Sequence, residues 1–363
     1  MTETYVLTAG GTGGHVFPAQ ALAEELINRG AKVCFVTDGR GDAFSKRFPD
    51  VDCHRVSAGA YAGLGKIGKL RGALKTGFGL LKALRLLKKI KPAAVVGFGG
   101  YASVPTVYAA EMLGIPVLLH EQNSVLGGAN RFLAKKATLI ATTFPRVAKI
   151  PAGKETVHTG VPVRPAILKL SDGAYSAPTD KFNLLIFGGS QGARILSDVV
   201  PAGLALLPDE IKARLTVAQQ ARAEDLPRLK EAYENSGIAP ELASFFSDMD
   251  KRLERAHLVV CRAGASTIAE LCTAGRPALI VPILRSPDSH QLHNAEFLAE
   301  NDAAFLKEEP DFTPETLRGF ILELFNDPEK LIMTSSNARR LAKPDAVSLL
   351  ADAVIKTGQK KKS

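Results

Sequence analysis

The sequence predicts an α/β protein made of two doubly wound parallel-sheet domains that face a cleft. Three observations support this fold class. Short β-rich runs alternate with helical patterns along the chain, as they do where helices cover a parallel sheet. Glycine-rich turns follow three of these runs and precede helical patterns. The chain has 363 residues, more than one hydrophobic core usually serves, so we expect two domains.

The first half contains six predicted strands. The first strand, 5–9, ends at the stretch AGGTGGH, and a later one, 94–97, ends at GFGGYAS. The carboxyl ends of parallel strands share one edge of a sheet, so we expect both glycine-rich turns at that edge. The other predicted strands are 32–37, 53–56, 116–120 and 138–141.

The second half restarts the same pattern at Phe182, where FNLLIF runs into the turn GGSQGAR. Between the halves, the stretch TGVPVRPAI contains two prolines and predicts a hinge. We therefore expect domains at 1–163 and 164–343. Further strands of the second domain are predicted at 215–220, 242–246, 257–261 and 277–283.

The composition is that of an ordinary globular protein, with 46% hydrophobic and 23% charged residues. Its four cysteines form no C-x-x-C pair, which argues against a disulfide framework or a zinc knuckle and favours a reduced, cytosolic setting. The longest uncharged stretch, 92–110, is broken by glycine and proline and does not read as a membrane span.

Basic residues are concentrated in one block of the first half. Ten Lys or Arg and no Asp or Glu lie between Cys53 and Ala110, although the net charge is only +9. Nucleic acid, anionic lipid and phosphorylated ligands all fit such a block. Within segment 64–91, apolar residues recur three or four apart, which is typical of an amphipathic segment on an anionic membrane surface. A core helix with a solvated basic face fits the spacing too, and the early glycines favour a loop there.

The glycine-rich turns predict phosphate binding. Without a Cβ the backbone can approach phosphate oxygens, and the following helix offers free N–H groups and its positive dipole end. A nicotinamide site is a poor fit, because Val16 stands where the G-x-G-x-x-G fingerprint needs its third glycine, even though Asp38 is placed to hold a ribose. In the second half, Glu270 lies one turn into a predicted helix and can accept two hydrogen bonds from a sugar diol. It also fits as a favourable acid in a first helical turn.

Six motifs, in this order and at these separations, resemble glycosyltransferase family 28, the enzymes that move N-acetylglucosamine (GlcNAc) from UDP-GlcNAc onto lipid I to give lipid II. The resemblance covers about residues 4–355. The motifs are GGTGGHVFPA, GFGGYASVPTVYAA, HEQNSVLGGANRFLAK, TGVPVR, GGSQGARILS and CRAGASTIAELCTAGRPALIVPI.

The resemblance implies a GT-B fold with two Rossmann-like domains. The second domain would hold UDP-GlcNAc, and the first would meet the lipid I acceptor, with segment 64–91 on an anionic membrane surface. Helix 344–357 would cross back to the first domain. It further implies a peripheral protein at the cytoplasmic face of the membrane, with no metal, no cofactor and no nucleic-acid partner.

The resemblance also assigns site residues. Thr12, Gly13 and Gly14 match the loop at the reacting end of the donor, and Asn130 matches a donor contact. Arg164 and Ser190 match contacts on the pyrophosphate side, and Phe246 lies where a backbone group reads uracil. Gln291 matches a contact to the GlcNAc hydroxyls, whereas His290 departs from the usual Gln-Gln pair. The nucleotide-binding helix start corresponds to Ala265, Ser266, Thr267, Ile268, Ala269 and Glu270.

An inverting transfer needs a base for the acceptor hydroxyl and stabilisation of the leaving diphosphate. His15 is our preferred base, because imidazole titrates near neutrality and a helix N-terminus would keep it neutral. Glu121 is the rival. Two other functions stay open: a different GT-B glycolipid synthase that uses another UDP-sugar, and a non-catalytic basic protein that binds nucleotides or nucleic acid.

Overall fold

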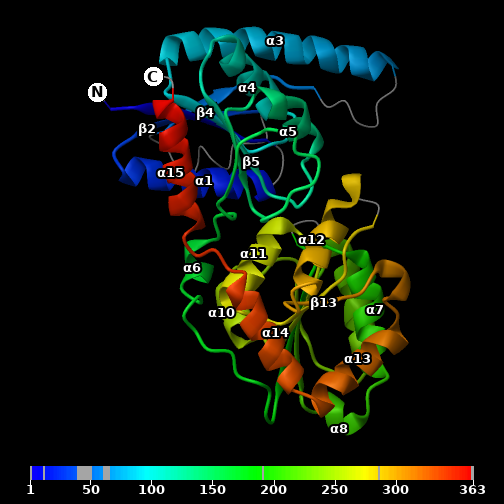
Figure 1. The fold of residues 1–363 in the computed structure, drawn as a ribbon. Helices are drawn as coiled ribbons and strands as arrows, with labels where there is room; N and C mark the ends of the chain where they lie inside the picture. The colour runs from blue at the N-terminus through cyan, green and yellow to red at the C-terminus, as the bar shows by residue number, and fades with distance from the viewer. Residues whose placement is uncertain are drawn as a thin grey trace. The chain divides into compact units, whose positions relative to one another are not determined.

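A computed structural model describes residues 2–10, 13–38, 51–59, 66–189, 192–284 and 287–360. The chain divides into two compact units (Figure 1). Unit 1 comprises Met1–Val163 and Asp345–Ser363, and unit 2 comprises Arg164–Pro344. Each unit contains a parallel sheet with covering helices, so the predicted fold class is confirmed.

The described part of unit 1 forms a seven-stranded sheet with the order β3-β2-β1-β4-β5-β6-β7, and every neighbouring pair is parallel. The strand order reverses between β1 and β4, which is the place where ligands bind in open α/β sheets. The strands are β1 (Thr4–Thr8), β2 (Lys32–Thr37), β3 (Asp52–Arg55), β4 (Ala94–Gly97), β5 (Val117–Glu121), β6 (Leu139–Thr142) and β7 (Thr156–His158).

Alternate residues of the strands in unit 1 feed two cores. Tyr5 and Leu7 of β1 join one core with residues of α1 and α15, whereas Val6 joins the other core with residues of α3 and α4. This period of two is what a sheet buried on both faces requires. The helices are α1 (Gly13–Asn28), α3 (Lys66–Ile90), α4 (Ser103–Met112), α5 (Gly128–Leu133) and α15 (Ala346–Gln359).

Segment 64–91 forms helix α3 from Lys66 onward, so the loop suggested by its glycines is wrong. Two of these glycines allow close packing instead. A Cβ on Gly79 would lie 1.9 Å from the carbonyl oxygen of Ser57, and Gly72 lies against Gly59. Thr76 accepts a hydrogen bond from the Gly59 N–H at 3.1 Å. The helix therefore tolerates glycine because tertiary packing outweighs intrinsic propensity. Residues 64 and 65 lie outside the described part.

The described part of unit 2 forms a six-stranded parallel sheet with the order β10-β9-β8-β11-β12-β13. Its strand order reverses between β8 and β11, as it does between β1 and β4 of unit 1. The strands are β8 (Phe182–Phe187), β9 (Leu215–Gln220), β10 (Glu241–Ala243), β11 (Leu258–Cys261), β12 (Ala278–Ile280) and β13 (Phe305–Leu306).

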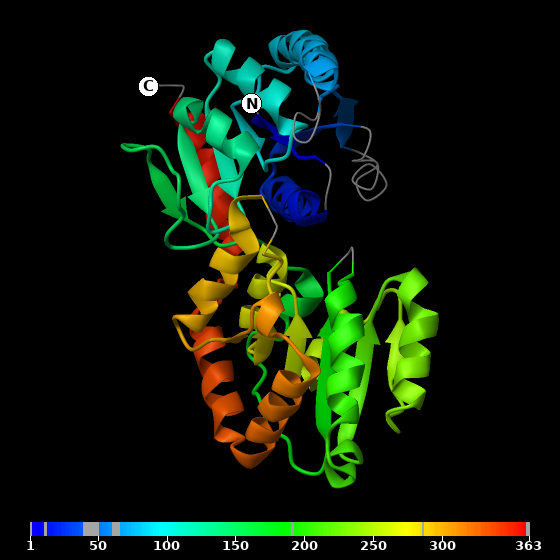
Figure 2. The same ribbon diagram turned by 90° about the vertical axis from the view of Figure 1, so that its right-hand side faces the viewer.

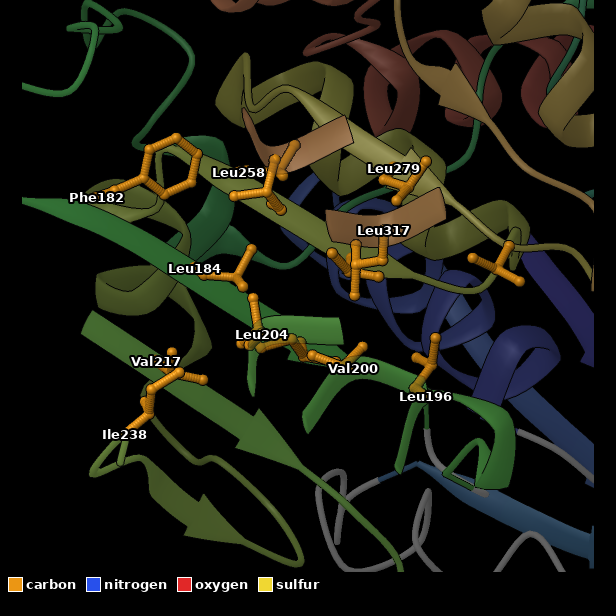
Figure 3. Close-up of a cluster of buried hydrophobic side chains, with 14 of the residues drawn as sticks. Phe182, Leu184, Leu196, Val200, Leu204, Val217, Ile238, Leu258, Leu279 and Leu317 are labelled. Carbon is orange, nitrogen blue, oxygen red and sulfur yellow. The ribbon is translucent and has the colours of Figure 1, made fainter. Parts of the chain in front are cut away.

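The core of unit 2 lies between this sheet and helices α7 and α13 (Figure 3). Phe182 and Leu184, at alternate positions of β8, share this core with Val200 and Leu204 of α7. Burying one such side chain stabilises the fold by about 1.5–3 kcal/mol. Figure 2 shows the last helices of the unit in orange beside its strands. The helices are α6 (Pro165–Leu168), α7 (Arg194–Ala205), α8 (Asp209–Lys212), α9 (Leu226–Glu234), α10 (Met249–Arg255), α11 (Ala265–Ala274), α12 (His290–Ala299), α13 (Pro314–Asn326) and α14 (Glu329–Arg340).

Three strands differ from the sequence prediction. The sequence prediction omitted β7 and β13, which lie at sheet edges and have only three and two residues. The run predicted over 242–246 ends at Ala243, and Phe245 beyond it is 71% exposed. Two adjacent aromatic residues therefore mimic a strand where the chain has already left the sheet.

Candidate functional site

Two glycine-rich turns of unit 1 meet at the carboxyl edge of its sheet. They follow β1 and β4, which pair in parallel so that Thr8 lies beside Gly97. A Cβ on Gly10 would lie 2.2 Å from that of Ala102, and a Cβ on Gly100 would lie 3.1 Å from the Gly10 carbonyl oxygen. Larger residues would separate the turns, so glycine is required here for close approach.

His15 lies beside the second of these turns. It is the third residue of α1, its side chain is partly buried, and a Cβ on Gly99 would lie 3.4 Å from its Nε2 atom. The same Cβ would lie 3.5 Å from Nδ2 of Asn130. Gly99 has a φ of +90°, which disfavours any side chain at this position. The bare backbone of Gly99 thus brings His15 and Asn130 together.

Glu121 ends β5 and is almost wholly buried, with 2% of its surface exposed. Its Oε1 accepts hydrogen bonds from the backbone N–H and the side-chain Nδ2 of Asn123, at 3.0 and 3.3 Å. Its Oε2 accepts bonds from the Gly127 N–H and from Nδ2 of Asn130, both at 2.9 Å. Burial raises the pKa of Glu121, while these N–H donors act to lower it. The carboxyl group is thereby engaged at both oxygens in fixing the loop before α5.

His120 and Gln122 flank Glu121 and form a second network that the sequence reading did not identify. Burial lowers the pKa of His120 to about 4, so its ring is neutral at pH 7. Its Nε2 lies 3.0 Å from the Gly160 carbonyl oxygen, which can only accept, so Nε2 carries the proton. Its Nδ1 accepts from Nε2 of Gln122, which also donates to the Phe98 carbonyl at 3.0 Å. This network connects β5 to the turn that contains Gly99.

Among the described residues, two buried amide oxygens in this region have no hydrogen-bond partner. They are Oδ1 of Asn130 and Oε1 of Gln122, whose side chains are 3% and 4% exposed. An unsatisfied buried acceptor is costly and calls for a ligand or solvent donor. Asn130 is thus equipped to accept a bond from a hydroxyl group as well as to hold Glu121.

In unit 2, the turn after β8 is tight. A Cβ on Gly188 would lie 2.3 Å from the Ala193 nitrogen, and Gly192 lies against Arg222. Gly189 has a φ of +77° and open space where a side chain would stand. This turn leads into α7, and the adjacent strand β11 leads into α11, so both helices begin beside the place where the strand order reverses.

Helix α11 begins at Ala265 without a side-chain cap on its first N–H groups. These groups and the helix dipole favour an anion at this end. Glu270 lies in the second turn, and its carboxylate accepts two hydrogen bonds from Arg164, at 2.6 Å from Nε and 2.9 Å from Nη2. The sequence did not predict this pair. The Glu270 and Arg164 side chains are 13% and 42% exposed, so a ligand can reach the pair.

Two other predicted residues of unit 2 make interactions of their own. Oε1 of Gln291 accepts a hydrogen bond from the Ile283 N–H at 3.1 Å, which fixes the first turn of α12 to the end of the β12 segment. The Phe246 ring is buried beneath the Arg252 guanidinium, 3.7 Å from the ring centroid. Only the backbone of Phe246 is thus suited to ligand contact.

The structure brings His15, Asn130 and Glu121 together in unit 1, and Arg164 and Glu270 together in unit 2. Gly13 and Gly14 begin α1. Thr12 and Ser190 lie outside the described residues. Within those residues, no three His, Cys, Asp or Glu side chains gather as metal ligands would, and no helix is both long and apolar enough to span a membrane.

Family models match both halves of the chain. The glycosyltransferase family 28 N-terminal domain matches residues 5–142, and the family 28 C-terminal domain matches residues 183–350. The chain is 49% identical over 353 residues to the UDP-N-acetylglucosamine–N-acetylmuramyl-(pentapeptide) pyrophosphoryl-undecaprenol N-acetylglucosamine transferase of Paramagnetospirillum magneticum, covering 96% of this chain and 95% of that protein. It is 48% identical to the protein of the same name from Rhodospirillum centenum, covering 96% and 93%.

Solved structures show the same architecture. The crystal structure of MurG from Acinetobacter baumannii is similar with a TM-score of 0.79 and 31% identity, covering 97% of this chain and 99% of that one. A UDP-GlcNAc 2-epimerase from Neisseria meningitidis, bound to UDP-GlcNAc, has a TM-score of 0.68 at 14% identity, covering 97% and 100%. The second likeness concerns the fold alone.

Proposed function

The chain belongs to glycosyltransferase family 28, and on this premise we propose that it transfers GlcNAc from UDP-GlcNAc to lipid I, giving lipid II for peptidoglycan synthesis. The observation that carries the proposal is 49% identity over nearly the full length of a relative that bears this activity in its name. In the reaction, the C4 hydroxyl of the muramoyl sugar attacks C1 of GlcNAc. The bond from C1 to the diphosphate breaks, UDP leaves with the electron pair, and a base takes the hydroxyl proton.

We propose that His15 is this base. It is only partly buried and lies beside Gly99, so a substrate can reach it. The neutral ring of His120, whose pKa burial lowers to about 4, adds no positive charge that would oppose protonation of His15. Asn130 has a free acceptor oxygen next to this position, suited to a sugar hydroxyl.

Glu121 is the weaker candidate for the base. Its two oxygens already accept four hydrogen bonds, so taking a proton would break at least one of them. We assign it a positioning role: it holds Asn130 and the backbone of Gly127 in place. A base must also be within reach of its substrate, and the partly exposed His15 meets this requirement better than the buried Glu121.

We propose that unit 2 holds the nucleotide. The uncapped start of α11 suits a phosphate, and the accessible Glu270 carboxylate suits a ribose diol. Arg164 would exchange part of its contact with Glu270 for the diphosphate, where a guanidinium stabilises the leaving group. The backbone of the turn from Gly188 to Gly192, with Ser190, would supply further donors.

We also propose that unit 1 binds the cytoplasmic face of an anionic membrane through α3. Three large apolar residues on this helix are exposed: Leu74 by 59%, Phe78 by 72% and Leu81 by 53%. Lys75, Lys82 and Arg85 are exposed along the same stretch. An apolar strip among cations is what an anionic bilayer surface attracts. Sedimentation with anionic vesicles at low salt should carry the protein down, and failure to sediment would exclude this mode of binding.

The decisive experiment for the activity is radiolabelled GlcNAc transfer from UDP-GlcNAc to a lipid I analogue by the purified full chain. The expected product is the β-linked disaccharide lipid. Competition among UDP, UDP-glucose and UDP-GlcNAc tests the alternative of another glycolipid synthase. Efficient transfer from UDP-glucose, with none from UDP-GlcNAc, would replace our proposal by that alternative.

A further inference from the structure

An apolar cavity of about 400 Å³ opens within unit 1 between α3, α4 and α5. Its size falls in the range of small-molecule sites, roughly 300–1,000 Å³. Its walls are almost wholly carbon. Its lining includes Leu80 of α3, Val104 and Tyr108 of α4, Tyr101, and Phe132 of α5. Walls of this kind favour a hydrocarbon occupant over a polar one.

Two residues of the cavity wall lie close in sequence to the candidate reacting groups. Tyr101 follows the turn whose Gly99 lies against His15, and Ala129, another wall residue, precedes Asn130. Consecutive Cα atoms are about 3.8 Å apart, so the cavity wall begins within a few ångströms of both loops. A group attached to a sugar held at Asn130 can therefore extend into this cavity.

Cations stand at the rim of the cavity. The Lys136 ammonium lies over the Tyr108 ring, 4.6 Å from its centroid, and also pairs with Glu111. A Cβ on Gly128 would lie 3.9 Å from Nη2 of Arg131. Lys75 of α3 is exposed next to Thr76, a wall residue. A hydrocarbon interior beneath a cationic rim complements an amphiphile whose anionic group adjoins its apolar chain.

We propose that this cavity binds the first isoprene units of the acceptor's polyprenyl chain, those next to its diphosphate. The inference rests on the proposed function, because that function supplies an acceptor in which sugar, diphosphate and isoprene units follow one another. The sugar meets Asn130 and His15, the diphosphate meets the cationic rim, and the chain enters the cavity. The exposed strip of α3 at Leu74, Phe78 and Leu81 is a separate surface that contacts the bilayer.

The test compares soluble lipid I analogues with one and with three isoprene units, without vesicles or detergent. In the wild-type protein, KM for the longer acceptor should be lower by roughly tenfold or more, because each buried methylene group strengthens binding. Equal KM values for the two acceptors would overturn the proposal.

Two variants alter the cavity itself. A Cβ on Gly77, a wall residue of α3, meets nothing within 4 Å, so Gly77→Phe adds a ring at the cavity without displacing the backbone. Phe132→Ala removes a wall side chain that is 62% exposed. Both should abolish most of the advantage of the longer acceptor. Unchanged acceptor preference in both variants would show that the chain binds elsewhere.

Two controls isolate the cavity from helix stability and from membrane attachment. Gly77→Ala improves helix propensity without filling the cavity, and it should keep the acceptor preference. Phe78→Ser changes the exposed strip and should weaken vesicle sedimentation while keeping the preference. If Phe78→Ser lost the preference for the longer acceptor, that preference would come from the exposed strip, and the cavity proposal would be wrong.

Binding of farnesyl diphosphate, measured by calorimetry, separates this inference from the proposed function because it needs no turnover. The wild type should bind this probe more tightly than inorganic diphosphate, and Gly77→Phe should lose that difference. Transfer activity without any preference for prenylated ligands would leave the function standing and overturn the cavity proposal. Binding of farnesyl diphosphate in the cavity without any transfer activity would support the cavity proposal and overturn the proposed function.

Discussion

The two units have the same strand order around the point of reversal, but their carboxylates differ. In unit 1, Glu121 ends β5, is 2% exposed, and accepts four N–H donors. In unit 2, Glu270 lies in α11, is within reach of solvent, and accepts two hydrogen bonds from Arg164. From the sequence alone, both residues are candidates for a functional carboxylate. The surroundings separate them: a carboxylate saturated with N–H donors builds a site, whereas one with an exchangeable partner can bind a substrate.

Removal of Glu121 should have the largest effect on stability. Glu121→Ala leaves four donors at its site without their acceptor, so the free energy of unfolding should fall by about 3 kcal/mol or more. The matched variant is Glu270→Ala, which should lower the free energy of unfolding by under about 1 kcal/mol because the pair of Glu270 with Arg164 is accessible to water. Urea titrations of the two variants measure both losses. Equal losses in the two variants would erase the distinction between the carboxylates.

Protonation of His120 should give the next largest effect on stability. Its pKa is lowered from 6.5 to about 4 in the folded protein, so the folded state disfavours the charged ring. The contribution of His120 to the free energy of unfolding therefore keeps its full value above pH 6.5 and decreases as the pH falls toward 4. A pKa shift of this size corresponds to a loss of about 3 kcal/mol. Unfolding titrations across this range should show a steeper acid loss for the wild type than for His120→Gln. Parallel pH profiles would mean that His120 is not held neutral.

The next prediction concerns the affinity of unit 2 for UDP. Glu270→Gln should weaken UDP binding by roughly tenfold, since a charge-assisted bond to the ribose becomes a neutral one. Calorimetric titration with UDP measures this, and Glu231→Gln, an exposed carboxylate of α9, serves as the control. Unchanged affinity in Glu270→Gln would move the ribose site away from α11.

Metal removal should have the smallest effect. We propose that Arg164, the helix starts and the turn backbone stabilise the departing diphosphate, so EDTA should leave the transfer rate within about twofold of its value without EDTA. The rate of radiolabelled transfer in EDTA and in added Mg²⁺ gives the comparison. Strict dependence on Mg²⁺ would assign the diphosphate to a metal ion.

The sequence was most informative where local pattern and topology agree. Buried strands such as β4 and β11 are continuous apolar runs, and glycine turns follow the strands at which the sheet order reverses, so fold class and site edge were predictable. The edge strands β7 and β13, with three and two residues, are too short to give such a signal. The sequence alone suggests that Gly72 and Gly79 weaken the helix. Their role in close packing depends on contacts with Gly59 and Ser57, which local sequence does not reveal.

The contacts of the site residues could not be predicted from the sequence for a similar reason. Nothing local in HEQN shows that Glu121 is saturated by donors from Asn123, Gly127 and Asn130, or that His120 is buried and neutral. The pairing of Arg164 with Glu270 joins residues 106 positions apart. Motif spacing identified which residues matter, while the assignment of binding and positioning roles required their partners in three dimensions.

The division of labour between the units can be measured directly in His15→Ala, as kcat for transfer together with the dissociation constant for UDP-GlcNAc. If His15 is the base and unit 2 holds the nucleotide, kcat should fall by about 10²–10⁴-fold while the dissociation constant stays within about twofold of the wild-type value. A kcat within about tenfold of wild type, or a loss of nucleotide affinity as large as the loss of rate, would contradict it.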